Sequence, residues 1–224
     1  MIMPASDSPN NEIRPVATPA EAASAIASRR ALLQRRQLLF PAEETGVVFE
    51  DEHIIIHRDP VGFPGGKFGT YIRIHERAIQ NGVAGVVILP KCGEDVFLHR
   101  IYRYPTRSWE WEFPRGFLEP GHSPEDMVRQ ELQEETGLTV ATIEELGLVL
   151  SNSGLLSGGV KAYVVQTQAT AGKPAPEAGE VIGELRRVSP ARLWSMAKAG
   201  EIRDGITLST MSLALAKQLL APPA

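Results

Sequence analysis

The chain has 224 residues, of which 43% are hydrophobic and 22% charged, an ordinary composition for a globular protein with a sizeable buried core. Its formal net charge of −4 excludes the basic character typical of proteins that bind duplex nucleic acid, although a few local arginines suffice for one phosphate group. Cys92 is the only cysteine, which excludes an intramolecular disulfide and a cysteine-based zinc site and indicates a reducing, cytoplasmic location.

The N-terminal part lacks the apolar core of a secretory signal, and no apolar run in the chain approaches the roughly 20 residues that span a bilayer. Residues 1–18 are polar, and we expect them to be disordered. The Ala-rich stretch 19–38 predicts a helix, so that residues 1–45 form a tail and an amphipathic helix. Its arginine pairs at 29–30 and 35–36 favour a solvated helix face, with nucleic-acid contact as the alternative.

Residues 46–80 predict a β-rich segment ahead of the main domain. Runs rich in β-branched and aromatic residues at 47–49, 53–57 and 70–75 are strand candidates. The prolines and glycines of the stretch 60–69 predict a turn region between the last two of these strands.

Residues 81–224 predict the main domain, in which strand and helix patterns alternate. Strands are expected at 84–89, 95–101, 109–113, 146–150, 160–166 and 182–188, and helices at 124–136, 190–199 and 206–220. Strands before and between helices predict an α+β or layered α/β domain. The stretch 171–180 is a loop by composition.

A complete set of helix signals lies in the sequence PRGFLEPGHSPEDMVRQELQEETGL. Ser123 is a suitable N-cap, Pro124 suits the first helical position, and Gly137 is a typical helix stop. The preceding loop contains Gly116 and Gly121, so its backbone can turn sharply and approach a ligand closely.

Within this helix Glu131, Glu134 and Glu135 stand at i, i+3 and i+4 and share one face. Val128 and Leu132 flank two of them, so the carboxylates of Glu131 and Glu135 are expected to face the protein. Like charges at this spacing cost roughly 0.2–0.5 kcal/mol per pair, and no Lys or Arg lies at helical contact spacing to offset them. Mg²⁺ is the natural candidate, since it takes oxygen ligands and shares sites with phosphates. The alternative is an ordinary solvated group of glutamates.

The same stretch resembles the Nudix box, G-x5-E-x7-R-E-U-x-E-E-x-G-U, in which U is aliphatic. Gly116 begins the pattern, and residues 131–138 match its second half at every specified position. His122 stands where the family has Glu, and Gln130 stands where it has Arg. The resemblance implies that these two side chains help to hold the helix against the loop, and as neutral groups they could still pair. It also implies a layered α/β/α fold with a mixed sheet between helices.

The resemblance covers about residues 45–220 and is greatest to the branch that hydrolyses ADP-ribose and nucleoside-diphosphate sugars. Residues 100–105 resemble that branch's QYR strand end, residues 111–114 its W-E-L-P sequence, and residues 202–207 the entry to its last helix. Residues 152–159 resemble its S-P-G-x-S-x-E loop but carry no acid at the position of the glutamate.

This resemblance implies roles for individual residues. Arg103 would contact the substrate's phosphates through its planar guanidinium, with an ordinary surface arginine as the alternative. Glu112 would bind substrate or a metal-linked water, or have a structural hydrogen-bonding role, and Gly116 would lie against the substrate. A late-loop glutamate often positions or deprotonates the attacking water, and between Glu177 and Glu180 the spacing to the next strand favours Glu180, against an ordinary solvated acid.

The sequence therefore predicts a Mg²⁺-dependent pyrophosphatase, with Mn²⁺ as a substitute and a small nucleotide, ADP-ribose or a sugar nucleotide, as substrate. Glu131, Glu134 and Glu135 would bind the metal, and Glu135 and Glu180 would be catalytic. The resemblance implies a homodimer, and neither a membrane nor a nucleic acid is an expected partner. The alternatives are a Nudix fold that senses a nucleotide without cutting it, a pyrophosphohydrolase of RNA 5′ ends, and, least favoured, a structural protein.

Overall fold

The computed structural model describes residues 14–15, 18–36, 45–168, 172, 174–175 and 181–223. The chain forms two compact units. Unit 1 comprises Met1–Arg77 together with Gly154–Ser157, and unit 2 comprises Ala78–Ser153 together with Gly158–Ala224. Most of the tail predicted for residues 1–18 lies outside the described residues.

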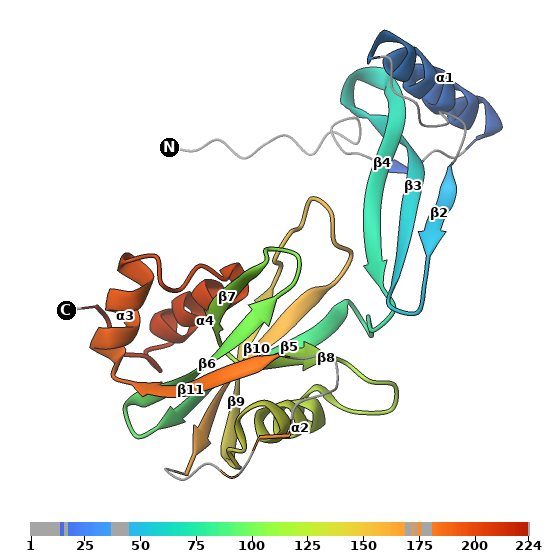
Figure 1. Cartoon of the computed structure of the whole chain (residues 1–224). Coiled ribbons are helices and arrows are strands. Elements are labelled where there is room, and N and C mark those ends of the chain that lie inside the picture. The colour runs from blue at the N-terminus through green and yellow to red at the C-terminus, as the bar shows by residue number, and fades with distance from the viewer. Residues whose placement is uncertain are drawn as a thin grey trace. The chain divides into compact units, whose positions relative to one another are not determined.

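Unit 1 is built on a four-stranded antiparallel sheet and one helix (Figure 1). Its elements are β1 (Arg14–Pro15), α1 (Pro19–Arg36), β2 (Gly46–Glu50), β3 (Ile54–Phe63), a short 3-10 helix (Pro64–Gly66) and β4 (Lys67–Glu76). β3 is central: β4 pairs along its whole length, while β2 and β1 share its other side. α1 packs against β3 and β4 and buries Ala25 completely. The expected helix is thus confirmed as far as Arg36, and the three expected strands are present.

The predicted turn region at 60–69 is wrong in extent, because β3 continues to Phe63 and β4 begins at Lys67. Pro60 pairs with Thr70 of β4 inside the sheet. On its other side β3 passes from β2 to β1 at this point, and among the described residues Pro60 has no strand partner there, which suits a residue without an N–H. Only the segment Pro64–Gly66 makes the turn, through its two glycines with positive φ.

Unit 2 contains a mixed seven-stranded sheet with helices on both faces (Figure 1). Its elements are β5 (Val83–Cys92), β6 (Asp95–Arg103), β7 (Ser108–Glu112), β8 (Arg115–Phe117), α2 (Pro124–Thr136), β9 (Val140–Val149), β10 (Gly159–Thr167), β11 (Ile182–Val188), α3 (Pro190–Lys198) and α4 (Gly205–Ala216). The order is β11-β6-β5-β10-β9, and β10 is parallel to β5 whereas the other pairs are antiparallel. The predicted α+β fold with layered helices is confirmed.

Some predicted boundaries in unit 2 need correction. The helix predicted at 206–220 ends at Ala216, because Gln218 adopts a φ of 60° that does not continue a helix. β9 begins at Val140 rather than at residue 146, since its polar first half pairs with β10 despite a weak apolar pattern. The strand β8 was not predicted, because its residues lie in a Gly-containing stretch that indicates a loop.

The sheet of unit 2 opens between β5 and β6. These two strands pair only at their hairpin end, through Lys91 with Val96 and Cys92 with Asp95. Farther along, β5 pairs with β8 and β6 pairs with β7. This divergence allows side chains from β6, β7, β8 and α2 to meet.

Two apolar cores hold the helices of unit 2 to the sheet. One core joins the sheet to α3 and α4 and includes Leu98, Leu193 and Met211. The other joins the sheet to α2 and includes Phe97 and Leu132. Complete burial of a side chain such as Leu132 contributes roughly 1.5–3 kcal/mol, so α2 is firmly anchored. In the part of the chain that the structure describes, every helix is too short or too polar to cross a lipid bilayer.

Candidate active site

The helix α2 begins and ends at the residues that its capping signals predict. The Ser123 hydroxyl accepts a hydrogen bond from the Asp126 N–H at 3.2 Å, and the Asp126 carboxylate accepts one from the Ser123 N–H at 3.1 Å. Hydrogen bonds from Ser123 also hold the pKa of the Asp126 carboxyl below its usual value. Pro124 lies in the first turn, and Gly137 ends the helix with a φ of 69°. The capping fixes where around the helix each glutamate points.

The apolar stripe of α2 turns two glutamates toward the sheet. Val128 and Leu132 are fully buried, and Glu135 beside them is only 1% exposed. The Oε2 atom of Glu135 accepts a hydrogen bond from the backbone N–H of Arg115 at 3.0 Å. Glu131, one turn earlier, is half-buried. The prediction that Glu131 and Glu135 face the protein is confirmed.

Gly116 leaves the space that the Glu131 carboxylate occupies. A Cβ atom at residue 116 would lie 1.7 Å from Glu131 Oε1 and 2.0 Å from its carboxyl carbon. Gly85 likewise allows β5 to approach β8 closely, because a Cβ there would lie 2.3 Å from the Gly116 carbonyl oxygen. The carboxylates of Glu131 and Glu135 therefore meet the backbone of two adjacent residues of β8.

A second acidic centre lies on β7. Glu112 is 1% exposed, and its Oε2 atom lies 2.6 Å from Nη2 of Arg103 and 2.9 Å from Nη2 of Arg115. Nη1 of Arg115 lies 3.2 Å from Oδ1 of Asp204, the N-cap of α4. Burial disfavours the charged form of Arg103, but the hydrogen bonds and charge of Glu112 outweigh it and raise the Arg103 pKa. The charges of Glu135 and Asp204 act in the same direction. Glu112 thus has a structural hydrogen-bonding role.

His99 is completely buried among these groups, opposite Glu112 in the β6–β7 ladder. Its Nδ1 atom lies 3.8 Å from Glu135 Oε2, and neither ring nitrogen has a hydrogen-bond partner among the described residues. Burial, followed by the positive charges of Arg103 and Arg115, lowers the pKa of His99 from 6.5 to about 3. The imidazole is therefore neutral near pH 7, and its contact with Glu135 is not an ion pair.

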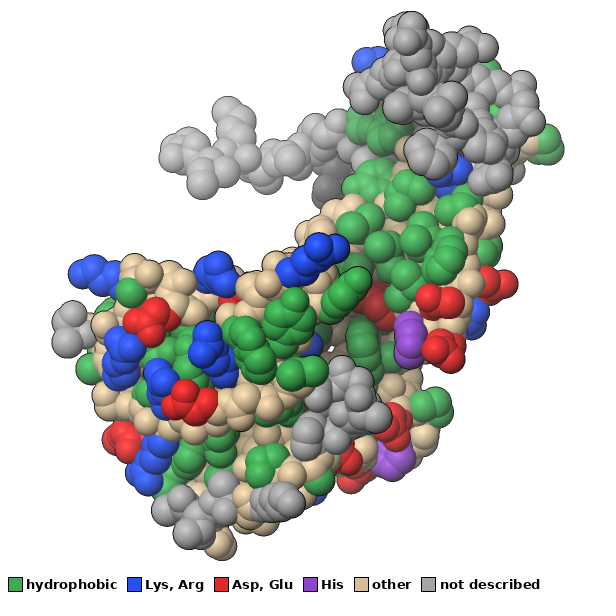
Figure 2. All heavy atoms as spheres, in the orientation of Figure 1, with side chains coloured by type: hydrophobic (Ala, Val, Ile, Leu, Met, Phe, Trp, Pro, Cys, Tyr) green, Lys and Arg blue, Asp and Glu red, His purple; other side chains and the backbone are tan. Residues whose placement is uncertain are grey.

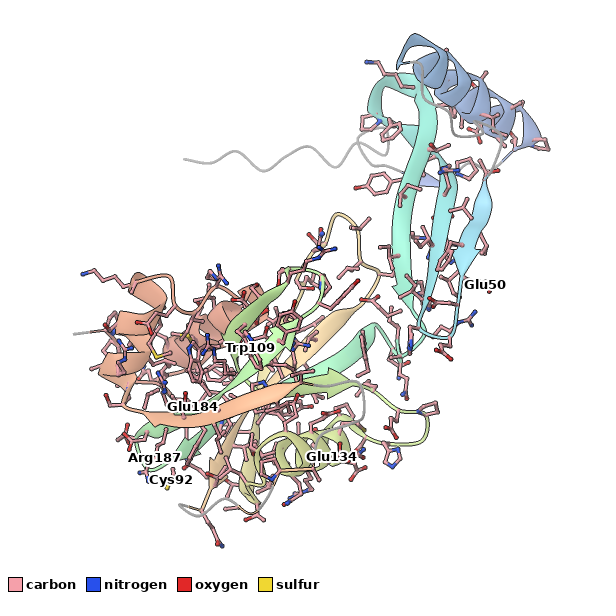
Figure 3. All side chains as sticks on the ribbon, viewed as in Figure 1. Glu50, Cys92, Trp109, Glu134, Glu184 and Arg187 are labelled. Carbon is pink, nitrogen blue, oxygen red and sulfur yellow. The ribbon has the colours of Figure 1, made fainter. Side chains whose placement is uncertain are left out.

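Carboxylate oxygens such as those of Glu131 and Glu135 are the kind of ligand that a hard divalent cation takes. Mg²⁺ is commonly bound through one or two carboxylates together with substrate phosphates and water. The described residues contain no group of three His, Cys, Asp or Glu side chains that could hold a metal ion. Glu134, which Figure 3 labels on α2, is half-buried, and the three predicted ligands are not gathered into one group. Glu131 and Glu135 are the part of the predicted metal site that lies against β8.

Two other predicted features lie elsewhere. Glu177 and Glu180, the candidates for the catalytic base, are outside the described residues. His122 is exposed, and its Nδ1 atom lies 3.8 Å from Oε2 of Glu119. Within the described structure no hydrogen bond joins it to Gln130, so the pairing that the sequence allowed is not formed.

Three residues of this centre were not predicted as site residues: His99, Arg115 and Asp204. One feature of the sequence could have identified His99. It lies between Phe97 and Ile101, where a single polar residue interrupts the buried face of a strand. Arg115 directly precedes the first glycine of the box, and Asp204 lies in a short helix-entry sequence. Neither of these positions indicates the contact between Arg115 and Asp204, because the two residues are 89 positions apart in the chain.

Curated relatives match part of this chain. The ADP compounds hydrolase NudE of Escherichia coli (strain K12) is 34% identical over 65 residues, which cover 29% of this chain and 35% of that protein. The ADP-sugar pyrophosphatase of Mus musculus is 42% identical over 62 residues, which cover 28% of each protein. The chain thus spans about a third or less of the length of these relatives.

A solved structure described as the crystal structure of ADP compounds hydrolase shares the fold. It has a TM-score of 0.62 and 21% sequence identity, and the likeness covers 79% of this chain and 91% of that one. The NUDIX domain family model matches residues 80–209, which is more than half of the chain. That match includes the capped helix with its two buried-face glutamates and the glycine that receives one of them, and the chain therefore belongs to the Nudix domain family.

Proposed function

We propose that this protein hydrolyses the pyrophosphate of a nucleoside diphosphate linked to another group, with Mg²⁺ as cofactor and ADP-ribose or a sugar nucleotide as substrate. The observation that carries the proposal is the placement of the Glu131 and Glu135 carboxylates against β8, at Gly116 and Arg115. The negative charge of Glu135 also acts on the guanidinium of Arg103 and contributes to raising its pKa. Relatives named for ADP compounds and ADP-sugars support this class of substrate.

In this proposal Glu131 and Glu135 hold the cation, and Glu134 is an additional ligand. Mn²⁺ is a substitute, because it also suits carboxylate and water ligands. When bound, the cation neutralises the pyrophosphate and makes water easier to deprotonate. Glu135 is thus proposed as both a ligand and a catalytic residue.

Arg103 is proposed to contact the substrate's phosphates. Its side chain is 29% exposed, whereas the Glu112 carboxylate that holds it is 1% exposed. The buried Glu112 carboxylate therefore fixes the orientation of the Arg103 guanidinium. The N–H groups of Arg103 that do not bind Glu112 would donate to phosphate oxygens. Glu112 contributes to substrate binding by orienting Arg103. The backbone at Gly116, which carries no side chain, lies against the substrate in this proposal.

Glu180 is the proposed general base. A water attacks one phosphorus in line, its proton passes to the Glu180 carboxylate, and the bond from that phosphorus to the bridging oxygen breaks. With ADP-ribose the products are AMP and ribose 5-phosphate. Phosphoryl chemistry of this kind depends mainly on positioning and charge stabilisation, which suits carboxylates on an anchored, capped helix.

A substrate panel tests the proposal. Product release is measured from ADP-ribose, sugar nucleotides, dinucleoside polyphosphates and nucleoside triphosphates, with Mg²⁺ and then Mn²⁺. Wild type is compared with Glu135→Gln, which keeps the shape and removes the charge. Glu125→Gln is the matched control, because Glu125 lies on the same helix but accepts a hydrogen bond from Tyr163 at 3.1 Å. Undiminished metal-dependent turnover by Glu135→Gln would show that the metal-site assignment is wrong.

The second candidate function is a nucleotide sensor that binds without cutting. The observation that favours it is that His122 is exposed and lies beside Glu119, so that in the described structure no Glu–Arg pair and no His122–Gln130 hydrogen bond joins these two positions of the box. Thermal stabilisation by a nucleotide that is never converted to product would support the sensor. Loss of RNA affinity on deletion of residues 1–38 would instead point to RNA 5′ ends as the substrate.

We also propose that the protein is a cytoplasmic homodimer that associates through unit 1. Three large apolar side chains of its sheet are well exposed: Val47 at 53%, Phe49 at 49% and Tyr71 at 38%. Figure 2 shows hydrophobic side chains gathered on the face of unit 1 that is in view. Light scattering on a gel-filtered sample measures the molar mass, and a monomer at micromolar concentration would contradict the proposal.

A further inference from the structure

Both ring nitrogens of His99 are buried without a hydrogen-bond partner among the described residues. An unsatisfied buried donor or acceptor costs roughly 1–3 kcal/mol, a cost that a leucine at the same place would not incur. Native proteins contain few such groups, and they often have a functional reason. The surroundings of His99 indicate what that reason is.

The imidazole of His99 lies close to the carboxylate of Glu135. Its Nδ1 atom lies 3.8 Å from Glu135 Oε2, the same oxygen that accepts the Arg115 backbone N–H at 3.0 Å. Oε2 accepts this backbone hydrogen bond, and we assign cation binding to Oε1. The separation of Nδ1 and Oε2 is about 1 Å longer than a hydrogen bond, so a hydrogen bond between them requires a side-chain shift of that size.

A neutral imidazole suits this position chemically. It carries one N–H donor, whereas an ionised carboxylate can only accept hydrogen bonds, so the Glu135 carboxylate is the natural partner of an Nδ1–H tautomer. A lysine or arginine in the place of His99 would also donate, but its positive charge would repel a cation at Glu135. Imidazole supplies the hydrogen bond without that charge.

We propose that His99 is a positioning residue for Glu135, in which Nδ1–H donates to Oε2 and fixes the carboxylate for cation binding through its other oxygen. This inference rests on the proposed function, since it assumes that Glu135 binds a cation. Removing such a supporting hydrogen bond lowers metal affinity by roughly 10- to 100-fold.

Three substitutions separate the hydrogen bond from the bulk of the side chain. His99→Asn keeps an amide N–H close to the position of Nδ1, whereas His99→Gln moves the amide outward to the position of Nε2. His99→Leu has no donor and is compatible with the apolar neighbours on β6. Thermal unfolding of each variant establishes that it is folded before metal is added.

The experiment titrates Mn²⁺, without nucleotide, into the full chain. The electron paramagnetic resonance signal of the free ion reports how much Mn²⁺ remains unbound. We expect His99→Leu and His99→Gln to bind Mn²⁺ about tenfold more weakly or worse, and His99→Asn to recover most of the wild-type affinity. If His99→Leu and His99→Gln both bind Mn²⁺ with the wild-type affinity, the inference is overturned. Nitrogen-14 modulation from an imidazole directly bound to Mn²⁺ would also overturn it, because His99 would then be a ligand.

Glu135→Gln distinguishes failure of the inference from failure of the proposed function. If Glu135→Gln loses Mn²⁺ while His99→Leu and His99→Gln retain it, only the role of His99 is contradicted. If Glu135→Gln binds Mn²⁺ as wild type does, or wild type does not bind it, the proposed metal site fails and the inference fails with it.

Discussion

The carboxylate of Glu131 occupies the space where a side chain at Gly116 would lie. The distance from a Cβ at residue 116 to Glu131 Oε1 would be 1.7 Å, which no pair of non-bonded heavy atoms tolerates. The first glycine of the box and the first glutamate of its helical half are therefore complementary in shape. This contact brings a carboxylate to the backbone of β8, where the proposed metal site begins.

Gly116→Ala is expected to impair function more than folding. The clashing atoms are at the end of a flexible side chain, so Glu131 can rotate away while the sheet stays intact. Overpacking typically costs about 1–3 kcal/mol, and we expect the lower end of that range. Displacing a functional group by about 1 Å can cost on the order of a hundredfold in turnover.

Urea unfolding and Mg²⁺-dependent turnover measure the two effects of Gly116→Ala separately. The control is Gly205→Ala, because a Cβ at that first residue of α4 would meet no atom within 4 Å. Wild-type turnover in Gly116→Ala would contradict the proposed role of Glu131.

Glu112→Gln is expected to destabilise the protein markedly. Glu112 is 1% exposed and compensates the charges of Arg103 and Arg115. Breaking a buried pair by removing one partner costs roughly 3–5 kcal/mol, and the partial exposure of both arginines favours the lower end. The control is Glu201→Gln, whose pair with Arg192 is exposed and worth less than about 1 kcal/mol. Similar shifts in the urea midpoint for both variants would contradict the assignment.

His99 is expected to weaken the fold as the pH falls. Its pKa is lowered from 6.5 to about 3, so between these values the unfolded chain takes up a proton that the native state does not. The free energy of unfolding then falls with falling pH, by at most about 1.4 kcal/mol per pH unit from this group. Relative to His99→Asn, wild type should lose stability from pH 6 to pH 4 and show a constant difference above pH 7. Urea unfolding in the presence of EDTA measures this, and a difference independent of pH would contradict the burial of a neutral imidazole.

Glu180→Gln is expected to lower kcat by about a hundredfold or more, because general base catalysis contributes on the order of 10²–10⁴. The comparator is Glu177→Gln, which removes the same charge three residues earlier in the chain. Steady-state kinetics with saturating Mg²⁺ measures both variants. A larger loss in Glu177→Gln would reassign the base to that residue.

The helix α2 was predictable from sequence because its signals are local. Ser123, Pro124 and Gly137 lie at its ends, and each acts on the backbone next to it. The direction of Glu131 and Glu135 followed from their spacing to buried neighbours on the same helix. The orientation of the two glutamates in the proposed metal site was thus predictable without any knowledge of the sheet.

The remainder of the centre depends on contacts between distant segments. His99 is explained only by its distance to Glu135 on another element, and the orientation of Arg115 depends on Asp204, far away in the chain, as well as on the nearby Glu112. No local pattern encodes these, because the divergence of β5 and β6 that brings them together is a property of the whole sheet. The continuation of β3 through Pro60 has a similar origin, since its neighbouring strands decide whether the missing N–H matters.

The rate of AMP formation from ADP-ribose tests the central claim most directly. It is measured for wild type and Glu135→Gln at saturating Mg²⁺, and for wild type with EDTA. Metal-ion catalysis supplies several kcal/mol of charge stabilisation, so we expect a loss of about a hundredfold or more in both the variant and the EDTA sample. AMP formation that is unaffected by EDTA and by Glu135→Gln would contradict a metal-dependent pyrophosphatase built on this helix.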